Sequence, residues 1–446
     1  MAYEHSKGSI VNPKTAADGK DVANEERCSD LIMLGLMAPF AGLGAGLIGA
    51  FFRLALEQAN GFRDSLIARM EIFGIAGFVL FVTLAAGAAT IAAWMVRCIA
   101  PSASGSGIPR VMAVLDGKMA PAPLRVVPVK FLAGTFAIGS GLALGREGPT
   151  VQMGASIAYQ IGKLLRRSWT DCRALMAAGA GAGFAVAFNA PIAGALFVFE
   201  GLLKRFEGRL VIAALAASAV AIWVGRAIFG DTPEFTVRPL TQPSLDKVPF
   251  FVFLGIVAGL AGTLYNRTLL ATLRITDRFS NLPVELRAAM VGTAVGTIAW
   301  FASTLVGGGD GLAQQALRGE GTLVVLPALF LFRLVLIACS VAAGAPGGLL
   351  VPFLALGAEL GLWIGLLSAL VFPGMTFEPE GFALVGMAAL FTAIIRAPLT
   401  AIVLVAEMTS NQTMLLPMMV ACFAAMLVST LFGDMSILDS LKERDR

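Results

Sequence analysis

The chain has 446 residues, of which 57% are hydrophobic and 14% are charged, with a net charge of +4 and a mean hydropathy of +0.81. A soluble protein would carry about 25% charged residues, so the composition excludes an ordinary soluble protein and leaves no soluble domain to bind nucleic acid. We expect an all-α, polytopic membrane protein, because a β-barrel would show short alternating segments instead. His5 is the only histidine and the five cysteines are scattered, so we expect no metal site and no cofactor.

The first 30 residues are polar and charged, which predicts a disordered, cytoplasmic tail without a secretory signal. Residues 31–440 form one predicted transmembrane domain, and residues 441–446 form a polar C-terminus. The basic segments 163–167 and 203–209 are typical of cytoplasmic loops. Five charge-free runs have the roughly 20-residue length of a bilayer span, namely residues 31–52, 72–96, 248–266, 288–309 and 411–433.

The transmembrane domain contains two similar halves, at about residues 31–228 and 248–440. The segment NAPIAGALFVFEGL at 189–202 matches RAPLTAIVLVAEMT at 396–409, and GREGPTVQMGA at 145–155 matches GGLLVPFLALGA at 347–358. Proline interrupts these apolar runs, and the residue before a proline is biased away from helix, so we predict helices that are broken inside the membrane. Repeated halves with broken helices are typical of transporters, whose substrate site lies where the broken helices meet.

Three stretches combine a glycine-rich turn, a proline and an apolar helical run, at residues 105–115, 145–162 and 347–365. Proline suits the first helical turn because its missing N–H needs no partner there. The unpaired N–H groups and the positive end of the helix dipole make each helix start a candidate anion site. Such a site would bind an anion without the full positive charge that would hold it too tightly for release.

Glu147 lies at the start of the second of these helices. Its carboxylate is itself an anion, so it would occupy the anion site when ionised and leave that site when protonated. We therefore predict that Glu147 acts as both a gate and a proton carrier, as intramembrane ionisable residues commonly do. A structural ion pair is the alternative role. Arg146 is expected to face a loop or lipid headgroups, because adjacent residues do not face each other on a helix.

The motifs GSGIP at 105–109, GREGP at 145–149 and GGLLVP at 347–352 make the chain resemble the CLC family of chloride channels and proton-coupled chloride transporters. The resemblance covers about residues 30–440. It implies an inverted-repeat fold with broken and re-entrant helices, and a homodimer in the lipid bilayer with a separate pore in each subunit. The implied substrates are chloride ions and protons, and the implied location is the inner membrane of a bacterium.

The resemblance also implies the role of individual residues. Glu147 matches the external gating glutamate, and Ser106 is similar to the serine of chloride-selective members, where the nitrate branch carries proline and the fluoride branch commonly methionine. The chloride-binding positions that it implies are Ser106, Gly107, Ile108, Leu349 and Leu350.

Two positions depart from the family pattern. Leu438 replaces the tyrosine that closes the inner side of the central chloride site, so we expect a weaker site or a leakier inner gate. Gly201 replaces the internal proton-relay glutamate and cannot carry a proton. Water or Glu200 would have to substitute for that relay, but we favour a structural role for Glu200, like that of its repeat partner Glu407.

We therefore expect chloride transport coupled to proton movement in the opposite direction, with Glu147 as the shared element. A passive chloride channel or uniporter of the same fold is the alternative, favoured by Gly201 and Leu438. Fluoride transport is a smaller alternative. An enzyme embedded in the membrane is disfavoured, because the apolar part of the sequence has no histidine and no paired aspartates.

Overall fold

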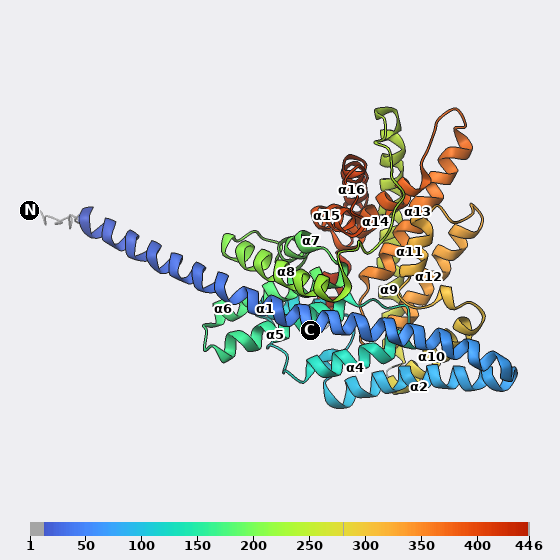
Figure 1. Cartoon of the computed structure of the whole chain (residues 1–446), viewed down its shortest axis with the longest axis horizontal. Helices are drawn as coiled ribbons and strands as arrows, with labels where there is room; N and C mark the ends of the chain where they lie inside the picture. Colours follow the sequence, from blue (N-terminus) through green and yellow to red (C-terminus); the bar gives the residue numbers. More distant parts are fainter. Residues whose placement is uncertain (1–12, 280, 445–446) are drawn as a thin grey trace, which may run out of the picture.

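The structure is a computed structural model that describes residues 13–279 and 281–444, with side chains from residue 32 onward. The described part is helical, and Figure 1 shows the helices in chain order. The α-helices are α1 (Pro13–Met70), α2 (Ile75–Ile99), α3 (Ile108–Leu115), α4 (Val126–Gly139), α5 (Glu147–Leu164), α6 (Trp169–Phe188), α7 (Pro191–Phe197), α8 (Gly208–Phe229), α9 (Val248–Arg278), α10 (Val284–Phe301), α11 (Asp310–Leu317), α12 (Val325–Ala342), α13 (Leu350–Val371), α14 (Pro379–Ile395), α15 (Pro398–Thr409), α16 (Leu415–Leu431) and α17 (Ile437–Arg444). A π-helical segment, η3 (Val198–Leu203), follows α7 directly.

Helix α1 begins at Pro13, inside the segment for which the polar composition predicted a disordered tail. Residues 1–12 of that predicted tail lie outside the described residues, whereas the backbone of residues 13–30 is helical. This stretch is rich in Ala, Lys and Glu, which have high helix propensity. It also continues the first apolar span without a break, so the costly nucleation step is already provided by the span.

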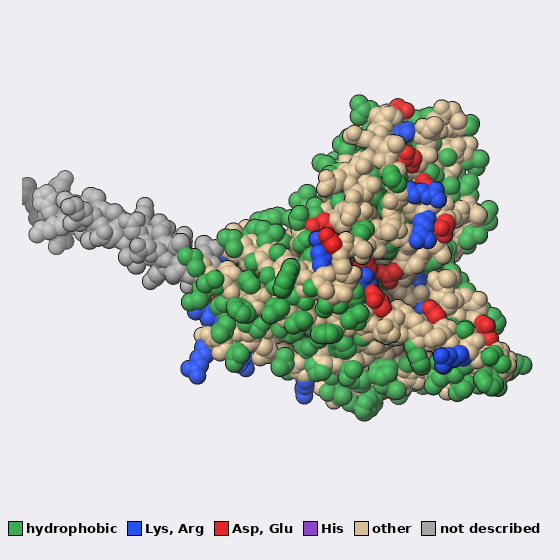
Figure 2. All heavy atoms as spheres, viewed as in Figure 1, with side chains coloured by type: hydrophobic (Ala, Val, Ile, Leu, Met, Phe, Trp, Pro, Cys, Tyr) green, Lys and Arg blue, Asp and Glu red, His purple; other side chains and the backbone are tan. Residues whose placement is uncertain are grey.

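Among the described residues, seven helices are long and apolar enough to cross a bilayer: α1 from Ile32, α2, α8, α9, α10, α12 and α13. The most apolar window of α13 is 83% buried, whereas the corresponding windows of the other six are 28–44% buried. Helix α13 is therefore enclosed by protein, while the others present a face to lipid. Hydrophobic side chains cover much of the visible surface over α1 and α2 (Figure 2).

The helices of the two halves recur in the same order, α1–α8 and then α9–α16. Helix α5 packs on α6, and α13 packs on α14 in the same way. Asn189 caps the C-terminus of α6 and Arg396 caps that of α14, both in the left-handed conformation. Helices α7 and α15 then begin at Pro191 and Pro398. The helix breaks that the sequence predicted at these two prolines are confirmed.

Glycines at equivalent positions set the helix crossings of both halves. Gly154 of α5 faces Gly179 of α6, and Gly357 of α13 faces Gly386 of α14. A Cβ atom at any of these four positions would collide with the backbone of the facing helix. Small residues at membrane helix crossings allow close backbone approach. The two crossings bring the starts of α5 and α13 into the interior of the protein.

Candidate ion-transport site

Backbone hydrogen bonds join the three glycine-rich loops that precede α3, α5 and α13. The Gly145 N–H donates to the Gly348 carbonyl at 2.8 Å, and the Gly348 N–H donates to the Gly145 carbonyl at 2.6 Å. The Gly347 N–H donates to the Gly105 carbonyl at 3.2 Å. The three helix starts that the sequence predicted as anion sites therefore meet at one place, and loops from both halves of the chain build it.

Glu147 is the first residue of α5 and is fully buried at this junction. Its Oε1 accepts a hydrogen bond of 2.5 Å from the N–H of Leu350, the first residue of α13. Its Oε2 is buried without a hydrogen-bond partner among the described residues. The carboxylate thus occupies a helix N-terminus that could otherwise bind a free anion.

Glycine is required around this carboxylate because the backbone approaches it closely. A Cβ atom at Gly145 or at Gly348 would collide with the carboxylate oxygens of Glu147. Gly107, before α3, has a left-handed backbone with a φ of 86°, and a Cβ atom there would collide with the side chain of Gln152. These positions explain why the loops are rich in glycine.

Ser106 lies beside the start of α5, on the other side of the junction. It is 8% exposed, and its hydroxyl has no hydrogen-bond partner in the described part of the chain. A Cβ atom at Gly148 would lie 2.5 Å from both the hydroxyl and the carbonyl oxygen of Ser106. Ile108, Leu349 and Leu350 are also buried, so a donor hydroxyl and two helix starts face one another in an environment with little water.

Two buried cations hold the loops in place. Lys130 of α4 donates from Nζ to the carbonyls of Ala103 and Gly105, at 2.9 and 2.7 Å. Arg333 of α12 donates to three carbonyls of the equivalent loop before α11, those of Leu305, Gly307 and Gly308, at 3.1, 2.9 and 2.9 Å. By binding these carbonyls, the two cations fix the loops before α3 and α11.

The sequence motifs do not mark Lys130 or Arg333 as residues of the site. The signal that could have paired them is their separation of 203 residues, which is also the separation of Pro149 and Pro352 in the matched motifs.

A cavity of about 480 Å³ leads to the junction from one side. Ser106, Gly107 and Leu349 line its inner end. Four arginines and one carboxylate line its wall, Arg97, Arg110, Arg287, Arg444 and Asp277, and the net positive charge attracts anions toward the junction.

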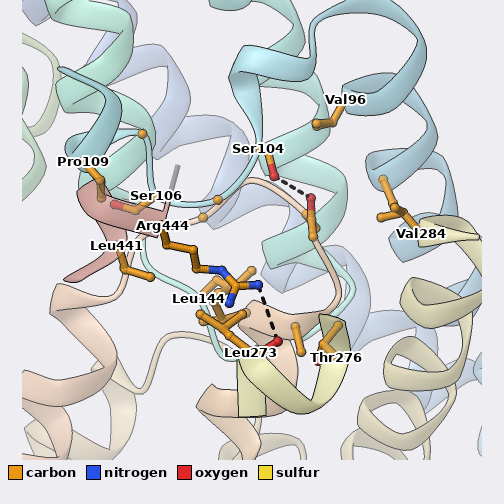
Figure 3. Close-up of a pocket in the computed structure, with 18 of the residues that line it drawn as sticks. Val96, Ser104, Ser106, Pro109, Leu144, Leu273, Thr276, Val284, Leu441 and Arg444 are labelled. Atoms are coloured by element: carbon orange, nitrogen blue, oxygen red, sulfur yellow. Dashed lines mark hydrogen bonds between the residues drawn. The ribbon is translucent and has the colours of Figure 1, made fainter. Parts of the chain in front are cut away.

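Figure 3 shows Arg444 of α17 reaching across this cavity toward α9. Its guanidinium donates to the Leu273 carbonyl at 3.4 Å and to Asp277 at 2.5 Å. These two bonds tie α17 to α9 beside the route to Ser106.

Residues 87–430 match the family model described as "Voltage gated chloride channel". The relative named H(+)/Cl(-) exchange transporter ClcA from Vibrio campbellii is 36% identical over 92% of this chain and 88% of its own length. The relative of the same name from Vibrio parahaemolyticus is 35% identical over 98% of this chain and 95% of its own. The chain belongs to the CLC family.

Solved structures of CLC proteins share its fold. A slow cyanobacterial Cl⁻/H⁺ antiporter is 32% identical, with a TM-score of 0.88 over 92% of this chain and 97% of that chain. A CLC-type fluoride/proton antiporter, at 22% identity and a TM-score of 0.78, is similar in fold. The inverted-repeat CLC fold and the predicted multi-pass membrane location are thus confirmed, and the protein is of a transporter and channel family.

Leu438, which the sequence predicts to stand in place of an inner-gate tyrosine, is 2% exposed on α17. Helix α17 packs against α3, which begins at the junction. Of the described residues that line the cavity, α17 contributes Leu441 and Arg444 but not Leu438. The leucine side chain therefore belongs to the packing of α17, and the structure does not bring it into the cavity.

Gly201, which the sequence predicts to stand in place of an internal proton-relay carboxylate, lies within η3. A Cβ atom at Gly201 would lie 2.5 Å from the Phe197 ring, which stacks on Phe184 with ring centroids 4.2 Å apart. Aromatic side chains therefore fill the space beside Gly201.

Glu200, next to Gly201, is held at the start of α15. It accepts hydrogen bonds from the N–H groups of Leu399 and Thr400, at 3.1 and 2.6 Å, and from the Thr400 hydroxyl at 2.7 Å. These donors give Glu200 the geometry of a helix cap, because a carboxylate there satisfies the first N–H groups of a helix.

Arg146, the sequence neighbour of Glu147, faces a loop as predicted. Its guanidinium donates to the Ala187 carbonyl at 2.8 Å and pairs with Glu234, in the segment between α8 and α9. Glu234 also pairs with Arg53 of α1 at 2.8 Å. Arg146 therefore anchors the start of α5 and leaves the Glu147 carboxylate without an ion pair among the described residues.

Proposed function

We propose that this protein exchanges chloride ions for protons across a bacterial inner membrane, and that Glu147 is the outer gate and the proton carrier. The observation that carries the proposal is the bond of 2.5 Å from the Leu350 N–H to the Glu147 carboxylate. A side-chain anion at a helix start, ringed by glycines, is in the position where a transported anion would bind.

The exchange would proceed by competition for the same donors. An ionised Glu147 blocks the pathway because it satisfies the start of α13. A protonated Glu147 has no net charge to hold it there, so it leaves and carries its proton with it. Chloride then binds the N–H groups of Leu349 and Leu350 and the hydroxyl of Ser106, with Gly107 and Ile108 contributing the start of α3. Deprotonation returns the carboxylate and displaces the ion.

Relatives named as proton–chloride exchangers support this proposal over most of the chain length. The unpaired hydroxyl of Ser106 supports chloride as the anion, because a donor hydroxyl suits a weakly basic halide and needs no charge.

A passive chloride pathway is the second candidate. It is favoured by Gly201, because glycine has no carboxylate that could deliver protons from the inner side. The Phe197 ring fills the space beside this glycine. In that case Glu147 would still gate the pathway, but protons would reach it from the outer side alone.

The test is proton movement in liposomes that contain the purified protein. A chloride gradient is imposed at clamped voltage, and the external pH is recorded together with chloride efflux. Uphill proton movement that is lost in Glu147→Ala supports exchange. Chloride efflux without proton movement contradicts exchange and leaves the passive pathway.

We also propose a homodimer that forms through α7, α8, α15 and α16. Ile192 and Leu399, which stand at equivalent positions beside the helix breaks, are 53% and 54% exposed, and Phe423 of α16 is 72% exposed. These apolar side chains lie beside the helix caps made by Glu200 and Glu407, which are partly exposed. A second subunit suits such a mixed surface better than lipid does, because lipid tails offer no partner to polar groups. Single-molecule photobleaching counts the subunits, and Phe423→Trp paired with Ile192→Trp would shift the population toward monomers by overpacking the interface.

A further inference from the structure

Glu359 is a buried carboxylate of α13 that the mechanism above does not use. It is 1% exposed, and neither carboxylate oxygen has a hydrogen-bond partner among the described residues. Burying an ionised carboxylate without hydrogen bonds costs several kcal/mol or more. A carboxyl group in a transmembrane helix is therefore a candidate proton-binding or ion-pathway residue, and such a residue commonly has a charged partner.

Arg333 is the cation near Glu359. A Cβ atom at Gly309 would lie 2.5 Å from the Arg333 guanidinium and 2.9 Å from Ala355, one helical turn before Glu359 on α13, and the two charges interact. The two side chains are buried, yet they form no salt bridge within 4.0 Å in the described part of the chain. The Arg333 Nε is buried without a partner, while its terminal nitrogens donate to the loop before α11. Glu359 thus balances the Arg333 charge from a distance instead of competing for its donors.

Arg333 connects this carboxylate to the gate through direct contacts. It donates to the Gly308 carbonyl at 2.9 Å. A Cβ atom at Gly308 would lie 3.4 Å from both the Leu144 carbonyl oxygen and the Val351 side chain. Leu144 precedes Gly145, which faces the Glu147 carboxylate, and Val351 follows Leu350, which donates to it. The loop that Arg333 holds therefore packs directly against Leu144 and Val351, the neighbours of the two residues that contact the Glu147 carboxylate.

Tyr265 of α9 is a further buried polar group on a helix that packs against α13. Its hydroxyl is buried without a partner among the described residues, and the charges of Glu147 and Arg333 both act on it. Its ring packs edge-on against Phe353 of α13, with centroids 5.9 Å apart. Tyr265 thus lies within the electrostatic range of both Glu147 and Arg333.

The buried charged or titratable groups on the helices packed against α13 are few. Arg333 lies on α12, Tyr265 on α9 and Glu147 on α5, and the partly buried Asp310 of α11 interacts with Arg333 and Glu147. The other charged residues of α9 and α5 are exposed, namely Arg267, Arg274, Asp277, Arg278 and Lys163. Helix α14 carries one charged residue, Glu380, at its start, where it faces Arg238. Arg333 is therefore the cation on which the charge of Glu359 acts.

We propose that Glu359 is a second proton-binding residue of this transporter and a positioning residue for the gate. When Glu359 is ionised, it offsets the positive charge of Arg333. When Glu359 binds a proton, the uncompensated Arg333 strengthens the positive field at the junction and favours the ionised, blocking form of Glu147. This inference rests on the proposed gating role of Glu147, and it makes transport respond to two protonations that oppose each other.

The experiment is chloride flux in liposomes between about pH 4 and pH 8, for the unaltered protein, Glu359→Gln and Glu359→Met. Both substitutions abolish proton binding, and methionine is an apolar control of similar length. We expect both profiles to shift toward acidic pH by about half to one unit, the size of a partly screened charge interaction. At a fixed pH on the alkaline side, flux falls by about three- to tenfold. Glu359→Asp keeps a proton-binding group, so its pH profile of flux should match that of the unaltered protein.

A structural role for Glu359 would not move the pH profile. Profiles of both neutral variants that superimpose on that of the unaltered protein overturn the proposal. So does a glutamine variant that shifts the profile while the methionine variant does not, because the cause is then a hydrogen bond.

Infrared spectroscopy separates this proposal from the gating role of Glu147. The pH-difference spectrum of Glu147→Gln should contain the carbonyl band of one protonated carboxyl that is missing from the spectrum of Glu147→Gln combined with Glu359→Gln. Subtracting the two spectra isolates Glu359 from the other carboxyl groups, and identical spectra contradict proton binding at Glu359, whatever the gate does. A pH profile of flux that is unchanged in Glu147→Gln contradicts the gating role instead.

Discussion

Glu200 and Glu407 cap each other's helices. Glu200, which follows α7, accepts the N–H groups of Leu399 and Thr400 at the start of α15. Glu407 of α15 accepts the N–H groups of Ile192 and Ala193 at the start of α7, at 3.0 and 2.8 Å. The two carboxylates join the halves of the chain at equivalent positions, 207 residues apart. A symmetric structural role for both follows from this reciprocity.

Replacing either glutamate by alanine should therefore destabilise the protein to a similar extent. Each substitution removes a charged acceptor from two helix N–H groups, which costs about 1–3 kcal/mol per unsatisfied buried group. Thermal unfolding in detergent would show comparable decreases in Tm for Glu200→Ala and Glu407→Ala. Proton transport per chloride should remain unchanged in the folded fraction. A Glu200→Ala protein with normal Tm but no proton transport would make Glu200 a relay residue.

Gly348→Ala should release the gate without removing it. The added Cβ collides with the Glu147 carboxylate, whereas Gly348 is not in the left-handed region, so alanine adds no backbone strain. The flexible carboxylate would move away from Leu350, and chloride efflux without proton movement should rise several-fold in liposomes. In a Glu147→Ala background there is no carboxylate to displace, so the substitution should have little effect. An equal rise in both backgrounds would point to a distorted loop.

Much of the architecture could be predicted from the sequence because it depends on local rules. Pro191 and Pro398 fix the helix breaks, since proline restricts the residue before it and cannot continue a helix. The three glycine-rich turns were recognisable as helix starts for the same reason. The repeat then indicated that they would meet.

The contacts that complete the site could not be predicted, because they join segments far apart in the chain. Arg333 donates to carbonyls that lie 25–28 residues away in the chain. The residues around Arg333 on α12 do not indicate which carbonyls it will bind. The ring of Phe197 beside Gly201 is also a matter of side-chain packing. Glu359 lies in an apolar helix with no partner in its own sequence, so only the packing of α12 against α13 relates it to Arg333.

Gly201→Glu tests whether the missing relay can be restored. The new side chain would overlap the Phe197 ring, so we expect the single substitution to cost about 1–3 kcal/mol through overpacking and to give little gain in proton coupling. Phe197→Ala combined with Gly201→Glu makes room for the carboxylate, although it removes the stacking on Phe184. The number of protons moved per chloride should rise in the double variant relative to Phe197→Ala alone. No rise would mean that protons reach Glu147 by another route or not at all.

The pairing of Glu234 with Arg146 and Arg53 should make stability depend on acidity. Burial alone would raise the pKa of Glu234, but the two guanidinium groups outweigh it and hold the pKa below its ordinary value of 4.5. A carboxyl whose pKa is lowered by folding contributes stability that is fully present above the unfolded value. That contribution is lost as the pH falls through the folded value.

Glu234→Gln should therefore lower the stability near neutral pH, by about 3 kcal/mol if the cost resembles that of breaking other buried ion pairs. The difference in Tm between the unaltered protein and the variant should shrink as the pH falls below about 4.5, where an unfolded Glu234 begins to bind a proton. Scanning fluorimetry across the acidic range measures this directly. Glu57→Gln is a matched control, because Glu57 also pairs with Arg53 but is 48% exposed, and its effect should be small at every pH. A Tm difference for Glu234→Gln that stays constant with pH would show that the loop is held by packing and hydrogen bonds instead of by charge.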